Sequence, residues 1–233
     1  MTLRRSSITL TLLLLIALVL VSTAMADPLL DFVVPATQTG AHIDYSTTGG
    51  PLTGTNIHVS ELVALGTPQN SGTYQCIGCF LNFVTGNYTG GGNTSWNFGG
   101  GPNSSITISG CVDVDNDGGS CDSNDIQSSK LLSGSFGNAT VIPFGNTFKI
   151  AGSQFMDMKD ANLAAFFGLQ SQGWTGNFNL SFDANGAPPQ TFKSTQVIGG
   201  DVVNTLVPEP GSCFLLLSAL AGAGALRRRK ARV

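Results

Sequence analysis

The chain has 233 residues and a formal net charge of −3 at pH 7, and only 11% of its residues are charged. Outside residues 1–26 and 211–233, the basic residues are four lysines, which stand against fourteen carboxylates. This acidic balance excludes nucleic acid as a partner, because phosphate binding requires a basic patch.

Residues 1–26 have the three-part layout of a cleaved secretory signal peptide. A charged start precedes an apolar run at 8–21, and the small residues Ala24 and Ala26 then provide a cleavage site. We therefore expect the secretion machinery to be a partner and the mature chain to begin at Asp27. The alternative is an uncleaved membrane anchor, since the apolar run is nearly long enough to span a bilayer.

Residues 27–206 are expected to form one β-rich extracytoplasmic domain. They are rich in Gly, Thr, Ser and Asn and poor in the residues that favour helices. Clusters of glycine supply turns between segments in which apolar and polar residues alternate. These alternating segments are 81–84, 106–108, 147–150 and 178–182. The pattern predicts a mainly β fold, either an antiparallel β-sandwich or a jelly-roll-like arrangement.

One segment of this domain departs from the strand pattern. Its apolar residues, at 163–167, have the spacing of a short helix. Asp157 or Asp160 is placed to cap the start of that helix, and Gly168 is placed to end it. We therefore expect one short helix packed on the sheet.

Four cysteines belong to the same domain: Cys76, Cys79, Cys111 and Cys121. In an oxidising compartment an even number of cysteines indicates disulfides, and we favour the local pairing, 76 with 79 and 111 with 121. A redox role for the C-x-x-C motif would need the start of a helix, whereas a strand pattern follows it. A zinc site built from all four thiolates is the remaining alternative, and export argues against it.

An acidic segment begins with three aspartates at alternate positions: Asp113, Asp115 and Asp117. With a glycine directly after them, they match the first half of an EF-hand or dockerin-like calcium loop. Position 12 of such a loop, counted from Asp113, is Asn124 rather than a bidentate glutamate. Asp125 or Asp122 would therefore have to complete the metal ligands. Ca²⁺ is therefore a candidate cofactor, and the alternative is a solvated acidic turn closed by a disulfide.

Residues 207–233 combine a polar motif, a short apolar run at 214–226 and a basic cluster. The motif residues are Pro208, Glu209 and Pro210, and the basic cluster contains Arg227, Arg228 and Arg229. This order is typical of a tail halted in the inner membrane as a transmembrane helix, with its positive charges in the cytoplasm. The tail would then anchor the protein in the membrane.

The same residues, in the same order, resemble the PEP-CTERM sorting signal. The resemblance implies recognition by an exosortase, a membrane-embedded protease or transpeptidase that cuts near the Pro-Glu-Pro motif. Such systems are associated with exopolysaccharide and biofilm production. An ordinary anchor that is never cut is the alternative, but residues 211–226 are short against the roughly 20 that a spanning helix needs.

The domain itself also resembles an uncharacterised β-rich type found among PEP-CTERM proteins. The likeness consists of strand and turn sequence patterns at residues 81–86, 96–101, 106–110, 131–136 and 200–204. The likeness implies a β-rich fold and does not imply an activity.

The domain lacks the G-x-S-x-G and H-E-x-x-H signatures, and His42 and His58 are expected to be surface residues on strands. We therefore expect no enzyme, but a structural or adhesive protein that passes the inner membrane and reaches the cell surface or biofilm matrix. A glycan-binding module that contacts exopolysaccharide is the alternative, with Trp96, Trp174 and Tyr88 as exposed stacking platforms. A polysaccharide-active enzyme would need two carboxylates facing one another in a cleft.

Overall fold

The computed structural model describes residues 27–207. The expected signal peptide with Ala24 and Ala26, the Pro-Glu-Pro residues and the expected C-terminal membrane helix lie outside the described residues. Within the described part of the chain, no helix is long and apolar enough to cross a membrane.

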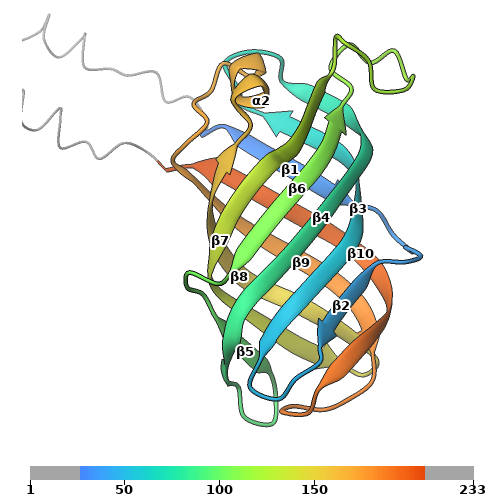
Figure 1. The fold of residues 1–233 in the computed structure, drawn as a ribbon, viewed down its shortest axis with the longest axis vertical. Helices are drawn as coiled ribbons and strands as arrows, with labels where there is room; N and C mark the ends of the chain where they lie inside the picture. Colours follow the sequence, from blue (N-terminus) through green and yellow to red (C-terminus); the bar gives the residue numbers. More distant parts are fainter. Residues whose placement is uncertain (1–26, 208–233) are drawn as a thin grey trace, which may run out of the picture.

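Ten strands and one helix make up the described chain (Figure 1). The strands are β1 (Leu29–Val34), β2 (His42–Tyr45), β3 (Pro51–Leu65), β4 (Gly72–Gly90), β5 (Trp96–Gly99), β6 (Ser105–Val112), β7 (Ile126–Phe144), β8 (Thr147–Lys159), β9 (Trp174–Ala184) and β10 (Phe192–Leu206), and the helix is α2 (Ala161–Phe166).

The strands form one antiparallel sheet that closes on itself. β1 pairs with both β3 and β10, β3 pairs with β4, and β6 pairs with both β4 and β7. The short strand β2 continues the row of β1 between β3 and β10, and β5 continues the row of β6 between β4 and β7. Closure satisfies the backbone groups that an open sheet would leave at its edges.

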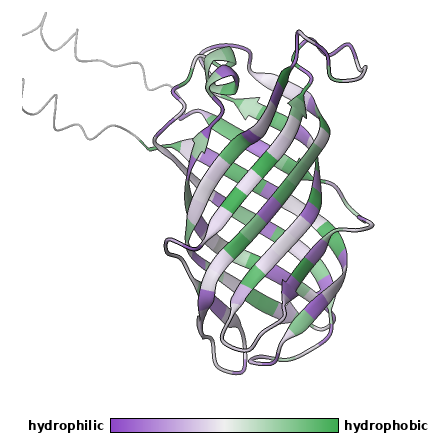
Figure 2. Ribbon diagram, viewed as in Figure 1, coloured by the Kyte–Doolittle hydropathy of each residue, from purple (hydrophilic) through white to green (hydrophobic). Residues whose placement is uncertain are grey.

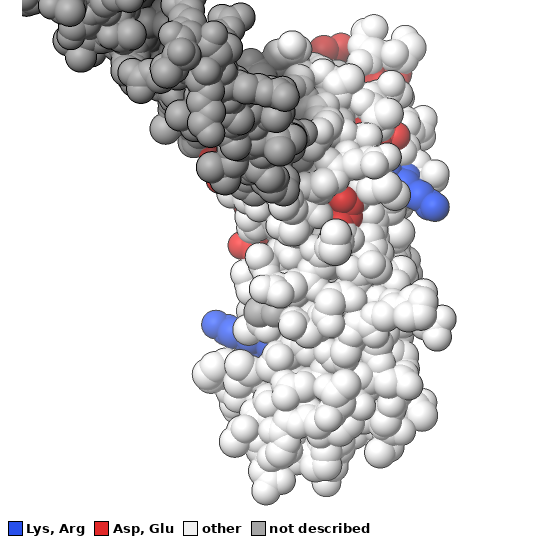
Figure 3. All heavy atoms as spheres, turned by 90° about the vertical axis from the view of Figure 1, so that its left-hand side faces the viewer, with Lys and Arg blue, Asp and Glu red and all other residues white. Residues whose placement is uncertain are grey.

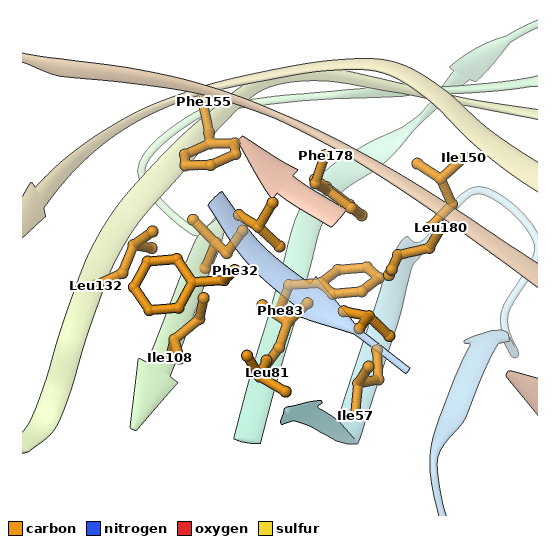
Figure 4. Packing of buried hydrophobic residues seen from close by; sticks show 14 of the residues in the cluster. Phe32, Ile57, Leu81, Phe83, Ile108, Leu132, Ile150, Phe155, Phe178 and Leu180 are labelled. Atoms are coloured by element: carbon orange, nitrogen blue, oxygen red, sulfur yellow. The ribbon is translucent and has the colours of Figure 1, made fainter. Parts of the chain in front are cut away.

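Inward side chains from opposite walls of the sheet meet in a single core. Figure 2 shows apolar and polar residues alternating along the strands, and Figure 4 shows the apolar side chains pointing toward one another. The Phe178 ring on β9 lies 5.1 Å from the Phe83 ring on β4 and 5.4 Å from the Phe136 ring on β7, measured between centroids. This layering of two walls over one core is sandwich-like.

The expected mainly β, antiparallel fold with one short helix is confirmed. The two walls belong to one continuous sheet, because long strands bend at bulges and carry the hydrogen bonding around the core. β4 and β7 each have 19 residues, and their pairings contain several register shifts. Alternation along a strand cannot distinguish this arrangement from two separate sheets, since each strand buries one face in both.

The helix α2 lies across one end of the sheet (Figure 1). Asp160 caps it by accepting hydrogen bonds from the backbone N–H groups of Asn162 and Leu163, at 2.8 and 3.3 Å. Gly168 follows the helix with φ +70°, a conformation that glycine adopts at low cost. The expected helix and its cap at Asp160 are thus confirmed, while Asp157 belongs to β8 instead.

The two ends of the molecule differ in charge. Both ends of the described chain lie at the α2 end, as does the acidic loop between β6 and β7 (Figure 1). The four loops at the opposite end, 46–50, 91–95, 145–146 and 185–191, contain no charged residue. On the face in Figure 3 the carboxylates accordingly gather toward one end, and the other tip is uncharged.

A half-buried carboxylate on β1 makes stability depend on pH. Burial, with a smaller contribution from the nearby Asp201, raises the pKa of Asp31 from its ordinary value of 3.8 to about 6. Because this pKa is raised in the folded state, the contribution of Asp31 to stability is greatest below pH 3.8. It is lost as the pH rises toward about 6.

We therefore expect Asp31→Asn to stabilise the protein at pH 7.5 and to have little effect at pH 4. After allowance for solvent screening, the gain at pH 7.5 is about 1 kcal/mol, or about 2–4 °C in melting temperature. Thermal unfolding at both pH values measures it, and Asp27→Asn, at an exposed position, is the control. An equal gain at both pH values would contradict the role of Asp31 ionisation.

Candidate functional site

The acidic loop 113–125 connects β6 to β7, and a disulfide ties Cys121 within the loop to Cys111 near the end of β6. A second disulfide joins Cys76 and Cys79 on β4, at the point where the pairing of β4 with β6 shifts register. Both bonds follow the local pairing expected from the sequence, which is confirmed. The four thiols are therefore committed to disulfides, which leaves none of them to bind zinc.

Three carboxylates of this loop converge. Asp113, Asp115 and Asp117 each offer an oxygen, and these oxygens lie within 4.8 Å of one another. Asp115 and Asp117 are exposed, whereas Asp113, which directly follows β6, is fully buried. The alternating positions expected for a calcium loop are thus brought to one place.

The carboxylate of Asp113 is only half satisfied. Its Oδ2 accepts a hydrogen bond from the backbone N–H of Gly118, at 3.1 Å. Its Oδ1 is buried and has no hydrogen-bond partner among the described residues. A buried oxygen without a partner is costly, and the neighbouring carboxylates add repulsion rather than a donor. A cation is the chemical group that would satisfy all three side chains at once.

The residues expected to complete the set of metal ligands make other contacts. Asp125 accepts hydrogen bonds from the backbone N–H groups of Val114 and Asp122, at 3.1 and 3.0 Å, and so braces the loop from within. Its oxygens group with the sulfurs of the Cys111–Cys121 disulfide rather than with the three converging aspartates. Asn124 donates its side-chain N–H to Asp115 Oδ2, at 3.4 Å.

The tryptophans expected to be exposed stacking platforms are both buried, so that expectation is wrong. Trp96 and Trp174 each lie on the inward face of a strand and are 0% exposed. Each indole N–H donates to a backbone carbonyl, that of Gln190 at 2.8 Å and that of Gln170 at 2.9 Å. A buried indole needs such a partner for its single polar atom.

Other residues singled out in the sequence are strand residues at or near the surface. His42 is exposed on β2, and His58 is half-buried on β3 with its ring 6.0 Å from that of Phe80. Tyr88 is half-buried, and its ring lies 5.6 Å from that of Tyr45. The surface position expected for the histidines is confirmed, and Tyr88 contributes to the core more than to a binding platform.

A buried polar cluster at the α2 end of the core was not predicted from the sequence. Lys159 and Asp157, two residues apart on β8, form an ion pair with both side chains inaccessible to solvent. Burial lowers the pKa of Lys159 to about 8, although Asp157 opposes this shift, and burial raises the pKa of Asp157. Phe155, Asp157 and Lys159 occupy alternate positions of β8, and Phe155 also faces the core. This alternation is the one sequence signal that would have placed both charged side chains in the core.

The chain matches one family model, that of the PEP-CTERM protein-sorting motif, over residues 206–230. Comparisons with curated proteins and with solved structures found no match. The matched segment begins at Leu206, the last residue of β10, and the backbone N–H of Val207 still donates to the carbonyl of Gly173, at 2.8 Å. The chain therefore carries a PEP-CTERM protein-sorting motif directly after its sheet, which marks it as an exported protein that is sorted through this C-terminal signal and implies processing by an exosortase.

Proposed function

We propose that the protein is a structural or adhesive component of the cell surface or of an exopolysaccharide matrix, which it reaches after transient anchoring in the inner membrane. The sorting motif at residues 206–230 is the observation that carries this proposal. The closed sheet and its two disulfides also suit a protein that must persist outside the cell.

The arrangement of the molecule supports a contact role for the uncharged end. The sorting motif begins at the α2 end, so the opposite end is the part of the domain farthest from the attachment (Figure 1). The loops there are built from Gly, Asn, Thr, Ser, Ala, Pro and Gln. Their neutral hydrogen-bonding groups match the neutral hydroxyl groups of a polysaccharide better than they match a charged partner.

Glycan binding is the second candidate, and with both tryptophans buried it rests on two grooves that adjoin β5. Neutral polar side chains line these grooves, among them Asn87, Thr89, Asn97 and Asn138. Neither groove contains a carboxylate, whereas a polysaccharide-cleaving enzyme would need two. We therefore favour binding or a structural role over catalysis.

Replacing Pro208, Glu209 and Pro210 together with alanine tests the sorting function. In a host that has the exosortase, we expect this variant to accumulate as a full-length, membrane-retained form, because the processing motif is gone. Mass spectrometry and membrane fractionation of the variant and the wild type measure the difference. Glu61→Ala, which removes an exposed glutamate from β3, is the control. Equal masses and equal fractionation would mean that the tail is only an anchor.

We further infer that the acidic loop binds Ca²⁺ through Asp113, Asp115 and Asp117. The unpartnered, buried Oδ1 of Asp113 supports this inference, since it lies in the cluster where the other two carboxylates converge. Calcium takes six to eight oxygen ligands in flexible geometry, so backbone carbonyls and water would complete the set. The bound cation would order a loop that projects from the α2 end of the sheet.

A further inference from the structure

The buried cluster on β8 includes a third polar residue from β10. Lys159 Nζ, already paired with Asp157 Oδ2, also donates to the side-chain oxygen Oδ1 of Asn204, at 3.2 Å. β9 lies between β8 and β10 in the sheet, so this contact crosses an intervening strand on the inner face. Lys159 and Asn204 are 45 residues apart in the chain.

The surroundings of the cluster exclude water. Asn204 is 0% exposed and Lys159 4% exposed, and Lys159 Nζ lies 4.5 Å from the centre of the Trp174 ring. The carboxamide of Asn204 is held in one orientation, because its Nδ2 donates to the backbone carbonyls of Leu30 and Val202, at 3.2 and 2.8 Å. Its oxygen therefore faces the lysine.

The ion pair is poorly satisfied for a purely structural one. Asp157 Oδ1 is buried without a hydrogen-bond partner among the described residues. A buried pair compensates for the loss of hydration only when its remaining polar atoms are also bonded. Burial lowers the pKa of Lys159 and raises that of Asp157, which favours a neutral amine beside a neutral carboxylic acid. A neutral amine is the nucleophilic form of lysine.

We propose that Lys159 and Asn204 react to form an intramolecular isopeptide bond that cross-links β8 to β10. Asp157 takes a proton from the Lys159 ammonium, and the free Nζ attacks the carboxamide carbon Cγ of Asn204. The new Nζ–Cγ bond replaces the Cγ–Nδ2 bond, and the protons given up by Nζ pass through Asp157 to Nδ2. Nζ gives up two protons in all, one before the attack and one after it, so Nδ2 leaves as ammonium, and the step requires no oxidant, reductant or cofactor.

The geometry favours this reaction over hydrolysis of the amide. The amine is held in hydrogen-bond contact with the carboxamide that it attacks, and such positioning replaces a bimolecular encounter with an intramolecular one. The buried cluster keeps out the competing water nucleophile. The cross-link would also sit near the sorting motif, since Asn204 precedes its first residue, Leu206, by two positions. Tension applied through the tail would then pass from β10 to β8 by a covalent bond.

Trypsin digestion of the purified full-length protein tests the bond directly. Trypsin cleaves after Lys149 and Lys193 but not after a lysine whose side chain is acylated. We therefore expect one branched species in which peptide 150–193, uncut at Lys159, is joined to the peptide that begins at Ser194. Its mass should equal the sum of the two peptides less one molecule of ammonia. Separate, full-mass peptides with cleavage after Lys159 would overturn the proposal and leave a buried ion pair.

Three variants assign the roles. Asp157→Asn retains the shape of the side chain but removes the proton acceptor, so it should give unlinked peptides; full linkage in this variant would overturn the role of Asp157. Asn204→Asp would release water in place of ammonia and should yield a branched species of the same mass as the wild type. Lys149→Arg, at an exposed position on the same strand, keeps the tryptic site and should leave the linkage intact. These readouts concern the bond alone and stay interpretable if the sorting function fails its own test.

Discussion

Phe178→Ala is expected to lower the free energy of unfolding by about 3–5 kcal/mol, because it leaves a cavity where the two walls of the sheet meet. The side chain is fully buried, and its ring contacts those of Phe83, Phe136 and Phe155. Aromatic residues from three other strands therefore lose their common partner. For a domain of this size, the melting temperature should fall by about 6–20 °C.

Thermal and guanidinium unfolding measure this loss, with Phe144→Ala as the control. Phe144 ends β7 and is 60% exposed, so its truncation removes little buried apolar surface. A similar loss of stability in both variants would show that Phe178 does not lie at the centre of the core.

Calcium is expected to raise the melting temperature of the wild-type protein by about 3–6 °C at ten times its dissociation constant. A ligand that binds only the folded state stabilises it by about 1.4 kcal/mol at that concentration, which gives the temperature shift for a domain of this size. The physical cause is relief of repulsion among the three carboxylates, together with a partner for Asp113 Oδ1. Magnesium should do less, because its octahedral geometry fits a flexible loop poorly.

The double variant Asp115→Ala, Asp117→Ala should lose the calcium effect. The double variant Asp27→Ala, Glu61→Ala should keep it, since it removes the same net charge at exposed positions outside the acidic loop. Melting curves that do not change between 0 and about 10 mM calcium, which exceeds the usual range for extracellular modules, would leave an acidic turn without a metal.

The amino-acid sequence by itself determined the features that depend on neighbouring residues. The sorting motif is recognised from the order of residues along one short segment. Strand alternation, the cap of α2 at Asp160 and the two local disulfides also involve residues close together in the chain. Each follows from a local rule of backbone geometry or hydrogen bonding, and no knowledge of the complete sheet is required.

The tertiary structure decided every feature that depends on which strands meet. Closure of the sheet follows from the pairing of β1 with β10, at opposite ends of the domain. Long-range packing buried Asp113 and turned Trp96 and Trp174 inward, against the exposure expected for both tryptophans. The contact between Lys159 and Asn204 likewise depends on which strands lie close together. Whether a polar side chain on a strand faces water or core depends on the opposite wall, so its chemistry emerges only when that wall is in place.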